Sequence, residues 1–129
     1  MKIQLLVRVT LALALVVGFS GAVTAHHSRA GLEPSDPAIV LKGTVAEYRW
    51  RNPHVLFFWD VKDASGKVVR WVGEFGSIAS SIASGMSKDS FKVGDEVTVT
   101  AIPSRAGTPV AILKKITLAD GTTVVGDAD

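Results

Sequence analysis

The sequence predicts a mostly β protein, a small barrel of five strands with one short helix between the third strand and the fourth. Three observations predict it. The 129 residues allow one ordinary domain, strand-like stretches fill most of the chain after residue 38, and one segment alone has helical periodicity. The chain has no cysteine, which excludes disulfide scaffolds, thiolate metal sites and cysteine nucleophiles.

Residues 1–25 have the pattern of a cleaved signal peptide. Lys2 and Arg8 form a basic start, an apolar run follows, and small residues lead to the expected cleavage after Ala25. Cleavage removes both cations, so the remaining 104 residues carry 12 Lys+Arg against 12 Asp+Glu. This zero net charge argues against nucleic acid as a partner. We expect a periplasmic protein without stable membrane insertion, whose partner is a periplasmic ligand or protein.

The next part of the chain predicts an extended arm and three antiparallel strands. Residues 26–38 have neither alternation nor helical spacing, so we expect an arm. Three stretches rich in β-branched and aromatic residues follow, separated by Asn52-Pro53 and by an Asp-Ala-Ser-Gly turn; we place these strands at residues 39–50, 55–61 and 68–75. Gly43, inside the first strand, is expected to mark a bend or bulge.

A short amphipathic helix is expected after the third strand. Ser77 is the expected N-cap, and Ile78, Ile82 and Met86 recur at four-residue spacing. These three apolar side chains are expected to cover one end of the barrel, and the neighbouring serines are expected to form the polar face of the helix.

Two longer strands and one short strand complete the expected barrel domain, which spans residues 39–125. Alternation predicts a half-buried strand at 96–101, and further strands are expected at 110–118 and 122–125. Residues 126–129 are expected to be a disordered tail. The order of three strands, one helix and two strands is that of the five-stranded OB-fold barrel. An SH3-like barrel and a β-sandwich are the alternatives.

The three histidines are the candidate metal ligands. Cleavage after Ala25 makes His26 the first residue, so its α-amine and imidazole become available together. One more imidazole, from His54 or His27, completes the flat three-nitrogen arrangement that copper(II) favours. His54 is the better candidate, because adjacent side chains on an extended segment point apart. Zinc is the alternative metal, and ordinary surface histidines are the alternative to any metal site.

Aromatic residues concentrate in the first three expected strands, the part of an OB-fold that commonly stacks ligands. Alternation puts Phe57 and Trp59 on one face and Phe58 on the other, so at least one large ring is expected outside the barrel. We expect a ligand surface at Trp50, Phe58 and Trp71. Its ligand would be a glycan, a peptide, a lipid or a partner protein.

Catalytic arrangements are weaker in this sequence. Asp60 and Glu74 are candidates to face each other across the second and third strands, but two carboxylates on a sheet are usually solvated charges. No Gly-x-Ser-x-Gly elbow and no phosphate-binding glycine loop is present. We therefore expect a binding module. The alternatives are a copper-dependent oxidase or monooxygenase with a histidine-brace site, and an interaction module that uses exposed aromatic residues.

Three motifs carry a resemblance to a known family: the start His26-His27-Ser28, the corner Trp50-Arg51-Asn52-Pro53-His54 and the ending Thr117-Leu118-Ala119-Asp120-Gly121. With them, residues 26 to about 124 resemble domain of unknown function 6152, an exported family of small bacterial proteins. The resemblance implies a periplasmic location and an OB-like barrel. It implies no established activity.

Overall fold

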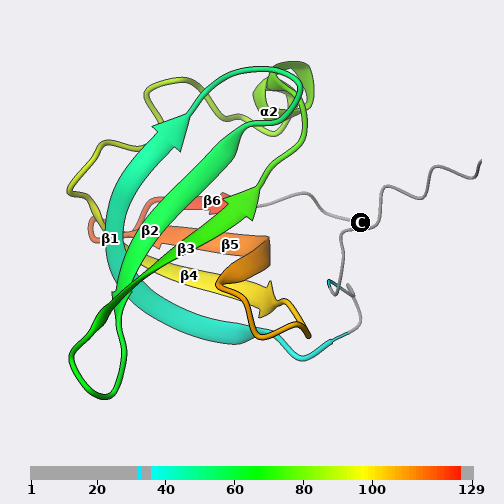
Figure 1. The fold of residues 1–129 in the computed structure, drawn as a ribbon. Helices are drawn as coiled ribbons and strands as arrows, with labels where there is room; N and C mark the ends of the chain where they lie inside the picture. The colour runs from blue at the N-terminus through cyan, green and yellow to red at the C-terminus, as the bar shows by residue number, and fades with distance from the viewer. Residues whose placement is uncertain (1–31, 33–35, 126–129) are drawn as a thin grey trace, which may run out of the picture.

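Six strands and one short helix make up the part of the chain that the computed structural model describes, which is Leu32 and residues 36–125 (Figure 1). The expected signal peptide, the tail and most of the expected arm lie outside these residues. None of the helices in the described part is long and apolar enough to cross a membrane. The elements are β1 (Ile39–Arg49), β2 (Leu56–Lys62), β3 (Val68–Glu74), α2 (Ile78–Ala83), β4 (Glu96–Pro103), β5 (Val110–Leu118) and β6 (Thr123–Val125).

The strands close into a barrel. The sheet runs β3-β2-β1-β4-β5-β6, and a further pairing of β3 with β5 joins its two sides. This closing pair is parallel and short, from Val72 opposite Val110 to Glu74 opposite Ile112, whereas the other pairs are antiparallel. A closed barrel of β1, β2, β3, β5 and β4 with a helix after β3 has the strand order of the OB-fold, which confirms the predicted fold class.

Alternate residues of each strand fill the barrel. Phe57 and Trp59 of β2 are fully buried, as is Val99 of β4, whereas Phe58 is half-buried on the outer face of β2. The predicted split of these three neighbouring rings between the two faces is therefore confirmed. Large apolar side chains inside and charged or hydroxyl side chains outside explain why the chain closes into a barrel in water.

β1 is long and pairs with two partners. Its first half pairs with β4, its second half pairs with β2, and the register shifts between Val45 and Glu47. The irregularity is therefore not at Gly43, where the sequence predicted it. Gly43 has a different role, because a Cβ atom at this position would overlap the backbone oxygen of Asp60 on β2. Glycine lets the two strands approach closely where β1 passes from one partner to the other.

The helix is shorter than predicted, and the predicted row of buried apolar side chains is only partly present. Ser77 is the N-cap as expected, since its side-chain oxygen accepts a hydrogen bond from Ser80 N at 3.2 Å. The helix ends before Gly85, whose φ of 82° permits the closing bonds of a Schellman motif, Gly85 N to Ile82 O and Met86 N to Ser81 O.

This early end changes which side chains reach the barrel. Met86 is buried, but it lies in the loop after the helix. Within the helix, Ile82 is 59% exposed and Ser81 is buried. The prediction that Ile82 covers the barrel and that the serines form a polar face is wrong for Ile82 and Ser81. A six-residue helix turns one narrow face inward, and that face begins at Ile78, which packs against the core.

Candidate functional site

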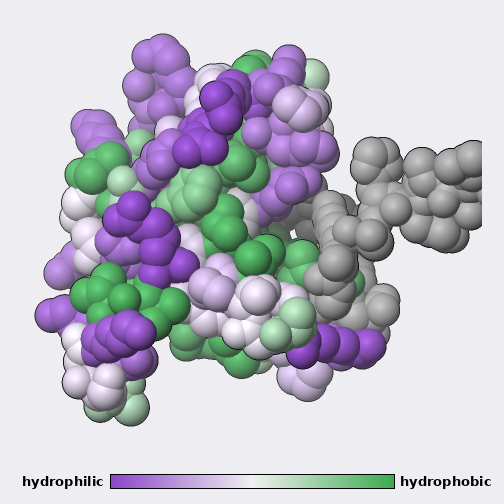
Figure 2. Space-filling view, in the orientation of Figure 1, coloured by the Kyte–Doolittle hydropathy of each residue, from purple (hydrophilic) through white to green (hydrophobic). Residues whose placement is uncertain are grey.

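The candidate site lies on the outer face of β2, β3 and β5, between the β1–β2 loop (residues 50–55) and the β4–β5 loop (residues 104–109). This surface is called the candidate face below. In OB-folds the face of the second and third strands, with these two loops, is the common ligand-binding region. Figure 2 shows apolar residues crossing the face of the barrel. A groove of about 150 Å³ lies on this face, and it is lined by Leu32, Leu56, Val72, Gly73, Glu74, Val110, Ala111 and Ile112.

His54 stands at the edge of this face. Its Nδ1 atom lies 2.8 Å from Oε1 of Glu74, and both side chains are about half exposed. His54 has no other hydrogen bond or ion pair among the described residues, so its second ring nitrogen, Nε2, has no polar protein partner there. A carboxylate that binds one ring nitrogen fixes the orientation of the imidazole and leaves the other nitrogen for a ligand.

The loop before β2 places His54 beside Glu74 through its backbone. Val55 N donates to the backbone oxygen of Gly76, and Phe75 N donates to the backbone oxygen of Val55 at 2.8 Å. The Asn52–Pro53 peptide bond is cis, and Asn52 Oδ1 accepts from Ile78 N at 3.0 Å, which ties the loop to the start of α2. The Asn-Pro-His corner therefore docks against the end of β3, where Glu74 lies.

Two described parts of the expected arm contact the barrel. Leu32 is half-buried and lines the same small groove as Glu74. Asp36 is held by Arg105 of the β4–β5 loop, with Nε and Nη2 of the guanidinium 2.5 and 2.6 Å from its two carboxylate oxygens. This two-bond pair lowers the pKa of Asp36 below its ordinary value of 3.8. Asp36 therefore contacts the β4–β5 loop, and Leu32 contacts the β3–β5 seam.

His26 and His27, the other two predicted metal ligands, lie outside the described residues. Within residues 36–125 and at Leu32, no three His, Asp or Glu side chains cluster closely enough to hold a metal ion. His54 is therefore the one predicted ligand whose surroundings the structure gives.

The three residues of the predicted ligand surface lie in different environments. Phe58 is on the outer face, where the guanidinium carbon of Arg49 lies 5.0 Å from its ring centre. Trp71 stacks on buried Trp59 with ring centres 6.0 Å apart, and Trp50 packs against the core, so these two rings contribute to the interior. The structure does not bring the three together on one face, and ligand binding by them stays a prediction.

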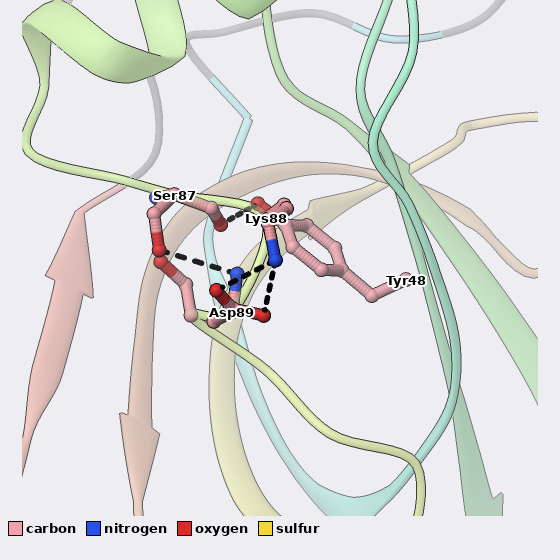
Figure 3. Close-up of polar contacts among 5 residues, drawn as sticks. Tyr48, Ser87, Lys88 and Asp89 are labelled. Atoms are coloured by element: carbon pink, nitrogen blue, oxygen red, sulfur yellow. Dashed lines mark hydrogen bonds and ion pairs between the residues drawn. The ribbon is translucent and has the colours of Figure 1, made fainter.

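Tyr48, next to Trp50, is also committed to the fold. Its hydroxyl donates to the backbone oxygen of Ser87 at 3.1 Å, and Figure 3 shows this contact beside the turn of Ser87, Lys88 and Asp89. Its ring packs edge-on against Phe91 with centres 5.0 Å apart. Burial raises the pKa of the Tyr48 phenol, so it stays neutral and acts as a donor that joins β1 to the loop after α2.

Asp60 and Glu74, considered as a facing pair in the sequence and set aside there, do not face each other in the structure. The register of β2 with β3 sets Asp60 opposite Arg70 and Glu74 opposite Leu56. Asp60 accepts two hydrogen bonds from Arg70, at 2.8 and 2.9 Å. The sequence analysis missed the contacts of Glu74 with His54 and of Asp36 with Arg105. Counting the β2–β3 pairs outward from the Asp-Ala-Ser-Gly turn brings Glu74 near His54, so the contact of these two residues could have been predicted from the sequence.

This architecture defines a small closed β-barrel with a shallow groove at the β3–β5 seam, which Leu32 of the N-terminal segment helps to line. The chain belongs to the Family of unknown function (DUF6152), which matches residues 13–112. Neither a curated protein nor a solved structure matches the chain.

Proposed function

We propose that this protein is an exported binding module that holds copper(II) on the candidate face. His54 supplies one imidazole, and His26, as the first residue after signal cleavage, supplies its α-amine and its imidazole. Three nitrogens of this kind form the tetragonal donor set that copper(II) favours. The export signal and the periplasmic location are part of the proposal, because the metal site requires the cleavage that exposes His26.

The contact between His54 and Glu74 is the observation that carries this proposal. Histidines that bind metals generally donate their other ring nitrogen to a carboxylate or a carbonyl oxygen, which fixes the tautomer and raises the basicity of the ligating nitrogen. With Nδ1 2.8 Å from Glu74 Oε1, His54 has Nε2 left for a metal. A merely solvated surface histidine needs no such partner.

The position of Leu32 supports the arrival of His26 at the same place. Leu32 lines a groove together with Glu74, and Glu74 contacts His54. His26 is six residues before Leu32 in the sequence. An extended chain covers about 3.3 Å per residue, so these residues span up to roughly 20 Å and can bring the first residue back to His54.

Copper(II) titration of the processed protein, starting at His26, against a competing chelator tests the proposal. We expect His26→Ala and acetylation of the His26 α-amine each to weaken binding strongly, because each removes one of the two donors of the amine–imidazole chelate. His54→Ala should weaken binding strongly. Glu74→Gln should weaken it by roughly 10- to 100-fold, the usual cost of losing a carboxylate behind a metal-bound histidine. Asp89→Asn, on a surface loop, is the matched control and should change nothing.

The acetylated protein is decisive, because it keeps every side chain and removes only the free amine. Copper binding as tight as in the processed protein would show that the amine is not a ligand. Unchanged binding in His54→Ala would remove the barrel from the site.

A further inference from the structure

A second concave surface lies beside the β2–β3 hairpin, which projects beyond the barrel in Figure 1, at the end of β2 and the start of β3 and so at the opposite ends of these strands from His54 and Glu74. It is a groove of about 620 Å³, within the range of small-molecule sites. It shares no lining residue with the groove that holds Leu32. Five strands contribute to it, and the side chains that matter below are Lys42, Thr44, Lys62, Glu96, Thr98 and Thr117.

Two lysines from neighbouring strands line this groove. The pairing of β1 with β2 ends at Thr44 opposite Asp60. Lys42 and Lys62 each lie two residues beyond this last pair, where the two strands separate. Neither lysine has a hydrogen bond or an ion pair among the described residues. Two ammonium groups that share one groove repel each other unless something neutralises them.

The acidic residues of the groove do not neutralise this pair. Asp60 is bound through both oxygens by Arg70, and this bonding lowers the pKa of the Asp60 carboxyl, so its charge is already balanced. Glu96 lies opposite Thr44 on β4 and forms no ion pair with either lysine. Two ammonium groups therefore face one unbalanced carboxylate, and the groove has a surplus of positive charge.

The wall between the lysines and β5 carries hydroxyl groups. Thr98 is opposite Lys42 on one side and opposite Thr117 on the other, and Thr44 is two residues further along β1. Threonine hydroxyls both donate and accept hydrogen bonds, which suits a ligand with hydroxyl groups of its own.

We infer that this groove binds a hydroxylated small molecule carrying an oxyanion, either a carboxylate or a phosphate, with Lys42 and Lys62 on the charged group and the threonines on the hydroxyls. The site is independent of the copper site proposed above. Lysine is a point charge that binds either oxyanion, so the two lysines select for charge and the threonines for the sugar-like part.

Amide-resolved NMR titration of the processed protein tests this inference with three probes of similar size: glucuronate, glucose 6-phosphate and neutral glucose. We expect at least one acidic sugar to shift the amides of Thr44, Thr98 and Thr117 saturably, and glucose to bind at least tenfold more weakly. Saturation by glucuronate alone assigns a carboxylate ligand, and saturation by glucose 6-phosphate alone assigns a phosphate ligand.

Lysine variants supply the second part of the test. Lys42→Gln and Lys62→Gln should each weaken the acidic probe at least tenfold, whereas Lys67→Gln, in the hairpin turn outside the groove, should leave it unchanged. Equal binding of glucose, no saturable shift with either acidic sugar, or an equal effect of all three lysine variants would overturn the inference. Preserved amide dispersion in each variant shows that the barrel is folded.

Discussion

Gly43 shows how one residue sets the geometry of the whole barrel. β1 changes partner from β4 to β2 near this residue, and both strands must approach it closely. A methyl group here would overlap the backbone oxygen of Asp60 and would also press on the indole of Trp59. A backbone oxygen inside a strand pair cannot rotate away as a side chain does, so the strands themselves would have to move.

We expect Gly43→Ala to lower the free energy of unfolding by about 3 kcal/mol, the upper part of the range for overpacking. Gly66→Ala is the comparison. Gly66 has a φ of 84° but open space around it, so its cost is the left-handed backbone alone, about 1 kcal/mol. Urea denaturation of both variants measures the difference. Equal costs would show that the contact with Asp60 is relieved by a small shift.

At the same scale, the sequence predicted His54 as a site residue but not its partner. His54 could be chosen from its residue type and from the preceding Asn-Pro dipeptide, since imidazole is the commonest metal-binding side chain. Recognising Glu74 as the partner of His54 required the register of β2 with β3. Register depends on which residues the turn at Asp63 to Gly66 leaves unpaired, which alternation alone does not determine.

At the scale of elements, the strands were more predictable than the helix. β5 was predicted with the bounds it has, and β1, β2 and β3 differ by one residue at one or both ends, because alternation of buried and exposed residues is strong in a barrel. The helix was predicted from a four-residue spacing that continues to Met86. In the structure the helix ends before Gly85, and Met86 reaches the core from the loop that follows.

Ile82 and Met86 therefore belong to the same sequence pattern but have opposite energetic roles. We expect Met86→Ala to lower the free energy of unfolding by about 2–3 kcal/mol, because it leaves a cavity in the core. Ile82→Ala should change it by no more than about 0.5 kcal/mol, the usual range at an exposed position. Thermal and urea denaturation measure both. A larger loss in Ile82→Ala would mean that a continuous helical stripe packs on the barrel.

At the scale of the whole molecule, contacts between distant parts of the chain complete both the barrel and its candidate face. The β3–β5 pair closes the barrel with three residue pairs, and Leu32 lies at this seam. Asp36 and Arg105 are 69 residues apart in the sequence. The order of strands and helix predicted that the sheet closes into a barrel, because few folds have this order. No local pattern predicted the ion pair, because a lone aspartate and a lone arginine in two loops have no periodicity to relate them.

This ion pair predicts how pH acts on the arm. Arg105 lowers the pKa of Asp36 in the folded protein below its ordinary value of 3.8. The pair therefore stabilises the folded state at pH values above that ordinary value, and its contribution is lost as the pH falls through the lowered pKa.

NMR titration of the Asp36 carboxyl should give a pKa below 3.8, and Arg105→Gln should return it toward that value, whereas Arg51→Gln, another exposed arginine, should not. The difference in unfolding midpoint between the wild type and Asp36→Asn should be present at pH 7 and vanish at the acid end. An Asp36 titration that is the same with and without Arg105 would mean that Asp36 is not held to the β4–β5 loop in solution, and the proposed copper site would then rest on the contact of Leu32 alone.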